Sequence, residues 1–92
     1  MTYVIQYSEL FDTKDLKSFP KPDLKRIKRA IEEKLTTKPE VFGKPLRRSL
    51  RGYRSLRIAD YRVIFRIEKD TVKIFAIGRR STVYEEYVNR LL

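Results

Sequence analysis

Three strand-like segments in close succession constrain the fold of this chain more than any other feature of its sequence. They are rich in β-branched and aromatic residues and cover residues 53–59, 61–67 and 71–77, a composition typical of strands. The turns between them, at Asp60 and at residues 68–70, are too short for a crossover connection, so neighbouring strands must run antiparallel. The segments therefore predict a three-stranded antiparallel meander.

Alternation along these strands sorts their side chains onto two faces. One face is expected to form the core, and its members are Leu56, Ile58, Tyr61, Val63, Phe65, Ile67, Val72, Ile74 and Ala76. The other face is partly basic and partly aromatic, and its members are Tyr53, Ser55, Arg57, Arg62, Ile64, Arg66, Lys73, Phe75 and Ile77. We expect this second face either to bind a partner or to lie under a terminal helix.

Helical patterns flank the meander on both sides. A short strand at 3–7 is followed by a helix over about 12–19, for which Asp12 provides the N-cap,. A longer amphipathic helix begins near Pro22 and ends before 36–39. Its apolar residues recur at spacings of three and four, namely Leu24, Ile27, Ile31 and Leu35,. A basic loop covers 39–51, and a last helix runs from after residues 78–80 to about Leu92.

This order of elements, β-α-α-β-β-β-α, predicts a small α+β fold with a mostly antiparallel sheet. The first two helices are expected to form a hairpin that covers the apolar face, and the last helix closes the chain. With 92 residues, there is room for one domain, spanning residues 1–92.

Composition excludes several classes of function. The chain has no cysteine and no histidine, so disulfides, thiolate nucleophiles, imidazole bases and the usual zinc sites are excluded,. Three glycines are too few for a phosphate-binding loop,. No apolar run is long enough to cross a membrane, and the first ten residues lack the apolar segment of a signal peptide,. We therefore expect a cytoplasmic protein without metal, cofactor or membrane contact.

Positive charge is concentrated in the second half of the chain. The net charge is +10, and residues 43–92 hold 13 basic but only five acidic residues. The middle of the chain carries a basic run with no acidic residue in it: Lys44, Arg47, Arg48, Arg51, Arg54 and Arg57. Such a run is often only a solvated face, but at this net charge it favours a polyanionic partner.

Arginines and a tyrosine are the polar groups that this topology brings together. Arg57 and Arg62 project from neighbouring strands on one face, while Arg79 and Arg80 follow the third strand and precede Tyr84. Such a set suits RNA cleavage, in which arginines stabilise the charge that develops on the phosphate and a phenol transfers protons. The alternative is purely structural, with the arginines solvated and Tyr84 packed against the sheet.

Several motifs, taken in order, resemble the RelE/ParE toxin family of type II toxin–antitoxin systems. They are Lys44-Pro45-Leu46-Arg47, Leu50-Arg51-Gly52-Tyr53, Leu56-Arg57-Ile58-Ala59-Asp60-Tyr61-Arg62-Val63-Ile64-Phe65, Ile77-Gly78-Arg79-Arg80 and Val83-Tyr84. The resemblance implies a toxin that cuts mRNA in the ribosomal A site without a metal, with contacts to 16S rRNA. It also implies an acidic antitoxin that holds the toxin inactive in a hetero-oligomer.

The resemblance assigns roles to individual residues. It implies three catalytic residues, Arg62, Arg80 and Tyr84, and an RNA contact at Arg47. The other basic residues expected to bind RNA are Lys44, Arg48, Arg54, Arg57 and Arg79.

The sequence also departs from the family pattern. Two lysines of RelE enzymes, one of them the general base, fall on Tyr53 and Ser55, which leaves the base unassigned. Arg79 replaces a histidine, and Ala59 replaces a turn glycine. Because the lysines are missing, two alternatives stay open: a ParE-like inhibitor of DNA gyrase, and a non-catalytic RNA-binding module.

Overall fold

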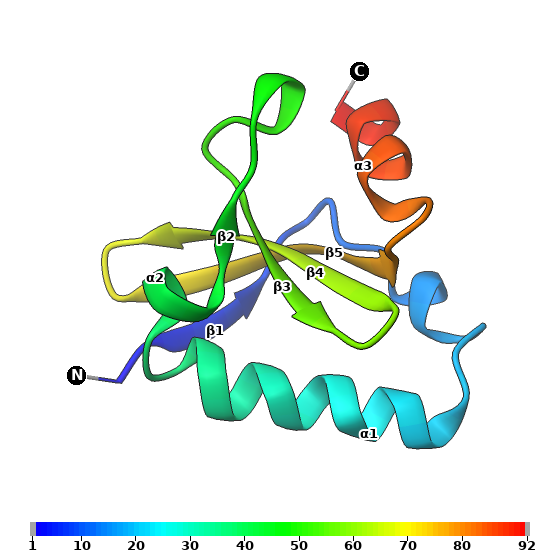
Figure 1. Ribbon diagram of the computed structural model, residues 1–92, viewed down its shortest axis with the longest axis horizontal. Coiled ribbons are helices and arrows are strands. Elements are labelled where there is room, and N and C mark those ends of the chain that lie inside the picture. The colour runs from blue at the N-terminus through cyan, green and yellow to red at the C-terminus, as the bar shows by residue number, and fades with distance from the viewer. Residues whose placement is uncertain (1, 92) are drawn as a thin grey trace.

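The computed structural model describes residues 2–91 and shows an α+β fold, as predicted (Figure 1). Its mixed sheet has the strand order β1-β5-β4-β3-β2. The strands are β1 (Val4–Tyr7), β2 (Lys44–Pro45), β3 (Arg54–Ile58), β4 (Tyr61–Glu68) and β5 (Thr71–Arg79). The helices are α1 (Lys21–Ala30), α2 (Pro39–Phe42) and α3 (Val83–Leu91). No helix among residues 2–91 combines the length and apolar character needed to span a membrane.

The predicted meander is confirmed as β3, β4 and β5. Two-residue turns join its strands, because Ile58 pairs with Tyr61 across the first turn and Glu68 pairs with Thr71 across the second. The N-terminal strand β1 runs parallel to β5 at one edge of the sheet. At the other edge, β2 pairs with β3 inside the loop for which no strand was expected, so the sheet has five strands.

A β-bulge in β5 corrects the predicted assignment of side chains to faces. Ile64 pairs with Ala76 but Phe65 pairs with Ile74, so Phe75 is an extra residue in β5,. Beyond the bulge the alternation is shifted by one residue. Ala76 therefore joins Phe75 on the second face, and Ile77 packs into the main core, the reverse of the prediction for both residues.

The helix expected over 12–19 is wrong in length. The structure has a 3₁₀ turn at Thr13–Leu16, for which Asp12 is the N-cap and accepts a hydrogen bond of 2.9 Å from the Lys14 N–H. A segment this short has little helical stability of its own, and Phe19 turns into the core instead, 9% exposed. The predicted hairpin of two helices is thus reduced to a single turn followed by α1.

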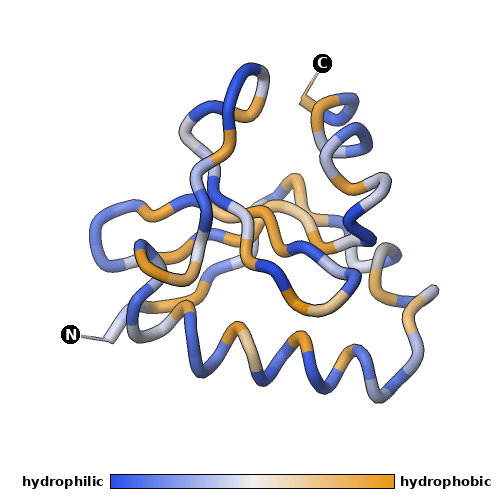
Figure 2. Tube along the Cα trace, in the orientation of Figure 1, coloured by the Kyte–Doolittle hydropathy of each residue, from blue (hydrophilic) through white to orange (hydrophobic). Residues whose placement is uncertain are grey.

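The amphipathic helix is confirmed as α1 and a π-helical segment, Ile31–Leu35, that continues it. Figure 2 shows apolar and polar residues alternating along this helix below the sheet. The Tyr61 hydroxyl donates a 2.5 Å hydrogen bond to the Asp23 carboxylate and so ties α1 to β4. This hydrogen bond is the main cause that raises the pKa of Tyr61.

Apolar side chains form one core on each face of the sheet. The main core lies between the sheet and α1 and includes Ile27, Leu35, Val63, Phe65 and Ile74. The second core lies between the sheet, α3 and the segment 46–53, and its buried members are Leu50, Ile64, Phe75, Ala76, Val83 and Tyr87. The second face is therefore covered in part by the terminal helix, which was one of the two expectations.

The first meander turn places an alanine in a left-handed conformation. Ala59 has a φ of 51°, which costs a residue with a Cβ about 1 kcal/mol relative to glycine,. We expect Ala59→Gly to raise the free energy of unfolding by about 0.5 kcal/mol, since glycine also loses more entropy on folding. Urea denaturation measures the change. Ala30→Gly in α1 is the control and should lose about 1 kcal/mol; a lower urea midpoint for Ala59→Gly would contradict the argument.

Candidate nucleic-acid interface

Two arginines lie opposite each other on the second face of the sheet. Arg57 on β3 pairs in register with Arg62 on β4, which places their Cβ atoms about 5 Å apart. Arg57 is exposed, and Arg62 is partly buried. The Arg62 guanidinium donates hydrogen bonds to the carbonyls of Ala59 at 2.9 Å and Tyr61 at 2.8 Å. These bonds hold the Arg62 side chain at the turn between the two strands.

A glycine on β5 allows the terminal helix to begin beside this arginine pair. Gly78 pairs with Arg62, and a Cβ added to Gly78 would lie 3.0 Å from two side-chain carbons of Val83. This distance is shorter than a Cβ normally has to its neighbours. The absence of a side chain at Gly78 therefore allows α3 to begin directly over the sheet. The next residue of the helix is Tyr84.

Tyr84 reaches back across the sheet to β3. Its hydroxyl and the Ser55 Oγ share a hydrogen bond of 2.8 Å. Ser55 is buried and lies two residues before Arg57 on the same face, about 7 Å along the strand. The structure thus brings Tyr84 to the face that carries Arg57 and Arg62.

Arg80 is attached to the same turn as Arg62. Its backbone N–H donates a hydrogen bond of 2.8 Å to the Asp60 carbonyl, and its side chain is exposed. A hollow of about 360 Å³ opens here, lined by Asp60, Arg79, Arg80 and Ser81. The turn at residues 59–60 therefore gathers the two arginines expected to be catalytic.

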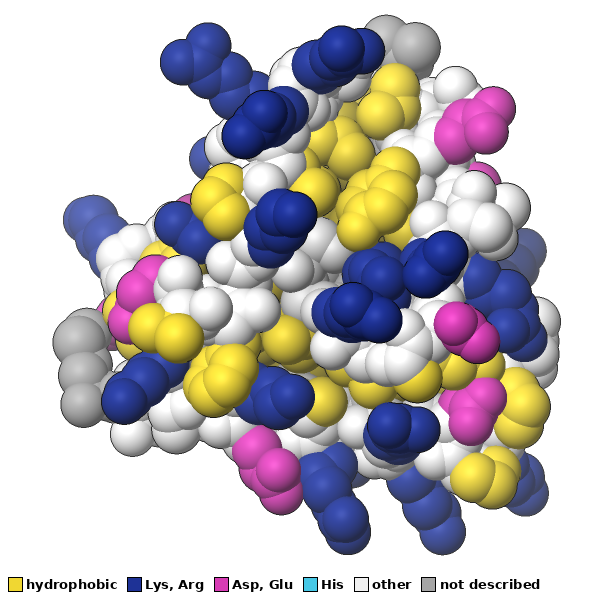
Figure 3. Space-filling model, in the orientation of Figure 1, with side chains coloured by type: hydrophobic (Ala, Val, Ile, Leu, Met, Phe, Trp, Pro, Cys, Tyr) yellow, Lys and Arg dark blue, Asp and Glu magenta, His cyan; other side chains and the backbone are white. Residues whose placement is uncertain are grey.

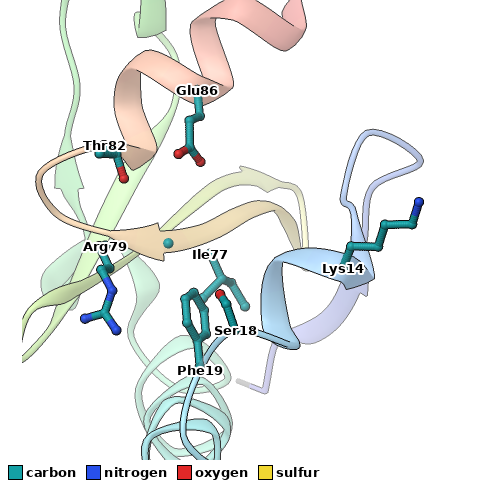
Figure 4. Close-up of a pocket in the computed structure, with 8 residues that line it drawn as sticks. Lys14, Ser18, Phe19, Ile77, Arg79, Thr82 and Glu86 are labelled. Atoms are coloured by element: carbon teal, nitrogen blue, oxygen red, sulfur yellow. The ribbon is translucent and has the colours of Figure 1, made fainter.

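Arg79 points to the opposite face of the sheet. It pairs with Tyr61, a residue of the main core, and its guanidinium carbon lies 5.2 Å from the centre of the Tyr61 ring. In Figure 4 its side chain extends from β5 away from Thr82, just before α3, and from Glu86 on α3, and all three residues line a pocket of about 320 Å³. Arg79 and Arg80 both line the hollow beside the turn, but the Arg79 guanidinium lies against the Tyr61 ring on the other face of the sheet.

The remaining basic residues expected at the interface are divided between two environments. Arg54 lies off the arginine face, because its guanidinium donates a 2.9 Å hydrogen bond to the Gly43 carbonyl. Lys44, Arg47 and Arg48 are exposed on β2 and the loop after it. Figure 3 shows lysine and arginine side chains on this loop and on the sheet below it, with apolar side chains between the loop and α3.

The positions of the two expected lysines are built into packing. Ser55 binds Tyr84, and the Tyr53 ring meets the rings of Phe75 and Tyr87 edge-on, with centroids 5.1 and 5.4 Å away. Burial is the main cause that raises the pKa of Tyr87. No basic side chain thus takes the place of either lysine, and the general base stays unassigned. Within residues 2–91, no three carboxylates gather closely enough to hold a metal ion.

Sequence reasoning missed Ser55 as a member of this site. Alternation had placed it on the same face as Arg57, but the hydrogen bond with Tyr84 joins residues 29 positions apart in the chain. Ser55 could have been found by combining the alternation of side chains along β3 with the position of the terminal helix over that face. This small basic α+β protein thus carries a surface suited to a phosphate backbone. The surface is formed by Arg57, Arg62, Arg80, Tyr84 and Ser55.

Comparison with known proteins identifies the family. Residues 5–84 match the family described as the ParE toxin of the type II toxin–antitoxin system parDE. The chain belongs to this family, and it is a toxin of a type II toxin–antitoxin system of the RelE/ParE group.

Relatives from Mycobacterium tuberculosis support the assignment. The chain is 31% identical to toxin RelG over 86 residues, which is 91% of this chain and 98% of RelG. It is 44% identical to toxin RelE over 52 residues, which spans 54% of each chain. Among solved structures, the toxin–antitoxin complex RelBE2 from the same organism contains a similar chain, with a TM-score of 0.78 and 30% identity over 88% of this chain and 94% of that one.

Proposed function

We propose that this toxin is an endonuclease that cuts mRNA on the ribosome in the cytoplasm and so inhibits translation. The observation that carries the proposal is the pairing of Arg57 with Arg62 on one face of the sheet. Like charges directly opposite each other on a sheet are destabilising, and a bound phosphate would remove that repulsion. Arginines also match the oxygens of a phosphate in a planar, two-pronged geometry.

The arrangement suggests how the cleavage would proceed. The ribose 2′-hydroxyl gives up its proton to solvent and attacks the phosphorus to form a 2′,3′-cyclic phosphate, negative charge builds on the non-bridging oxygens, and the bond to the leaving 5′-oxygen breaks. Arg62 and Arg80, both fixed at the turn 59–60, would stabilise that charge,. Tyr84 is held on the same face by its hydrogen bond with Ser55, and it would pass a proton to the leaving oxygen,.

Primer extension on ribosome-bound mRNA tests this proposal. The purified toxin is expected to produce cuts within the codon in the A site, and Arg80→Ala should lower the rate of cutting about 10²-fold by removing charge stabilisation. Lys17→Ala removes the same charge at an exposed position elsewhere and should cut normally. Absence of cuts by the unaltered toxin would contradict the endonuclease and leave the two alternatives, an inhibitor of DNA gyrase and a non-catalytic RNA-binding module.

Inhibition of DNA gyrase is the second candidate. Its support is that Tyr53 and Ser55 occupy the positions of the two lysines and are held in packing, so the general base of RelE enzymes is absent. A supercoiling assay with purified gyrase separates the candidates. Inhibition of supercoiling without cleavage of mRNA would favour gyrase, and cleavage without inhibition would favour the endonuclease.

An acidic antitoxin is the partner that we infer for this chain. The similar chains from M. tuberculosis and Methanococcus jannaschii were solved in complexes with antitoxins. A net charge of +10 and the basic face suit an acidic segment that folds on binding. Such a segment would cover the arginine face and exclude RNA from it.

A further inference from the structure

A second basic hollow lies outside the arginine face, between α1 and the end of β3. Its volume is about 230 Å³. Arg26, Arg29 and Lys34 line it from the helical side, and Arg57 lines it from β3, with Glu33 as its acidic residue. We call it the α1–β3 hollow. Figure 3 shows basic side chains projecting from the lower edge of the molecule, where α1 lies in Figure 1.

The positive charges of the α1–β3 hollow lack acidic partners. The ion pair found among the described residues joins Arg66 and Glu68, so none of the four basic side chains has a described carboxylate within 4.0 Å. The Lys34 ammonium lies over the Phe42 ring, 5.5 Å from its centre. The guanidinium groups of Arg26, Arg29 and Arg57 belong to exposed residues. They are therefore available to an anion.

The strand β3, which forms one side of the hollow, also has an uncovered outer edge. β2 pairs only with Arg54 and Ser55, so no other strand of the described chain covers the outer edge of β3 from Leu56 to Ile58. Arg57 is a residue of both sites at this open edge, because it lines the hollow while its side chain lies beside Arg62 on the arginine face. A single extended ligand could follow positive charge from one site to the other around this edge.

We propose that the α1–β3 hollow binds a backbone phosphate of the mRNA strand, to one side of the bond that the toxin cuts. The inference rests on the proposed endonuclease function and extends its substrate site by one anchoring point. A phosphodiester chain is favoured over an acidic protein segment because the shared Arg57 makes the hollow continuous with the site proposed for RNA. The two arginines of α1 would act as phosphate clamps that carry no sequence preference.

Binding of a single-stranded RNA oligonucleotide tests the proposal. A 2′-O-methyl oligonucleotide cannot be cut by attack of the 2′-hydroxyl, so fluorescence anisotropy reports binding alone. The double variant Arg26→Ala/Arg29→Ala should bind about tenfold more weakly. The slope of log affinity against log salt should fall by about 0.7 for each phosphate that the variant no longer neutralises. Alanine favours helix, so α1 should stay folded.

A matched control separates the hollow from net charge. Lys25→Ala/Lys28→Ala removes two charges from the same helix at exposed positions that do not line the hollow. We expect its affinity to stay within about twofold of the unaltered toxin. Equal losses in the two double variants would overturn the proposal, because they would show that only the total charge matters.

Glu33 supplies a test with the opposite sign. Glu33→Gln removes the negative charge of the acidic residue that lines the hollow and should tighten RNA binding about twofold; weaker binding would contradict the proposal. Poly-L-glutamate serves as an acidic protein probe. If the arginine variant lost affinity for poly-L-glutamate but kept its affinity for RNA, an acidic protein would be the occupant and the proposal would be overturned. Binding and cleavage are measured separately, so the two proposals can fail independently. If only the Arg26→Ala/Arg29→Ala variant lost RNA binding and the unaltered toxin cut no mRNA, the endonuclease function would be contradicted but the phosphate site would not.

Discussion

Tyr84→Phe is expected to lower the rate of mRNA cleavage about 10²- to 10⁴-fold, the range typical of removing a general acid or base. The substitution keeps the ring, which is partly buried against the second core, and removes only the hydroxyl. Stability should therefore change by about 1 kcal/mol, the usual net value of one hydrogen bond. Single-turnover cleavage of ribosome-bound mRNA, followed by primer extension, measures the effect.

Ser55→Ala is the control that separates chemistry from structure. It removes the same 2.8 Å hydrogen bond from the other side and leaves the phenol in place. If Tyr84 transfers a proton to the RNA, Ser55→Ala should lower cleavage less than about tenfold while Tyr84→Phe abolishes most of it. Similar losses in the two variants would mean that the hydrogen bond only positions α3, and Tyr84 would not be a catalytic residue.

The meander could be predicted because its signals are local. Two short turns and a strict alternation of side chains decide strand direction and face without reference to the rest of the chain. The bulge at Phe75 could not be predicted, because an extra residue in one strand is defined only by its partners Ile64 and Phe65 on β4. The same holds for β2, whose two residues carry no periodic pattern, and for the parallel pairing of β1 with β5.

The candidate site divides in the same way. The alternation of side chains was enough to place Arg57 and Arg62 together, because residues paired across adjacent antiparallel strands point to the same face of the sheet. The position of the Arg79 side chain beside Tyr61 depends on their pairing beyond the bulge, where the alternation has already shifted. The Tyr84–Ser55 hydrogen bond depends on where α3 crosses the sheet, which Gly78 permits by having no side chain. Such tertiary facts leave no periodic trace in the sequence.

The loop that carries Arg47 and Arg48 depends on close packing behind it. Gly43, just before β2, is buried and packs against the Phe65 ring. A Cβ at this position would lie 2.2 Å from the ring Cζ and 2.9 Å from the Pro39 carbonyl oxygen. The φ of Gly43 is −92°, a value that any residue adopts, so the constraint is purely one of space.

Gly43→Ala is therefore expected to lower the free energy of unfolding by about 3 kcal/mol, at the upper end for overpacking a core. Phe65 is fully buried, so its ring cannot swing away without displacing the main core, and the Pro39 carbonyl belongs to the backbone of α2. Urea denaturation measures the loss. Because Arg54 binds the Gly43 carbonyl, a displaced residue 43 should also disturb the start of β3 and weaken RNA binding by the loop.

Two further variants identify the cause of that loss. Gly52 has a φ of 95° and nothing within 4 Å of a Cβ added there, so Gly52→Ala should cost only backbone strain, about 1 kcal/mol. Phe65→Leu removes the ring atoms that the new methyl group would contact. In a double-mutant cycle, Gly43→Ala should therefore cost at least about 1 kcal/mol less in the Phe65→Leu background than in the unaltered chain. Additive losses would show that the Phe65 ring is not what requires glycine at position 43.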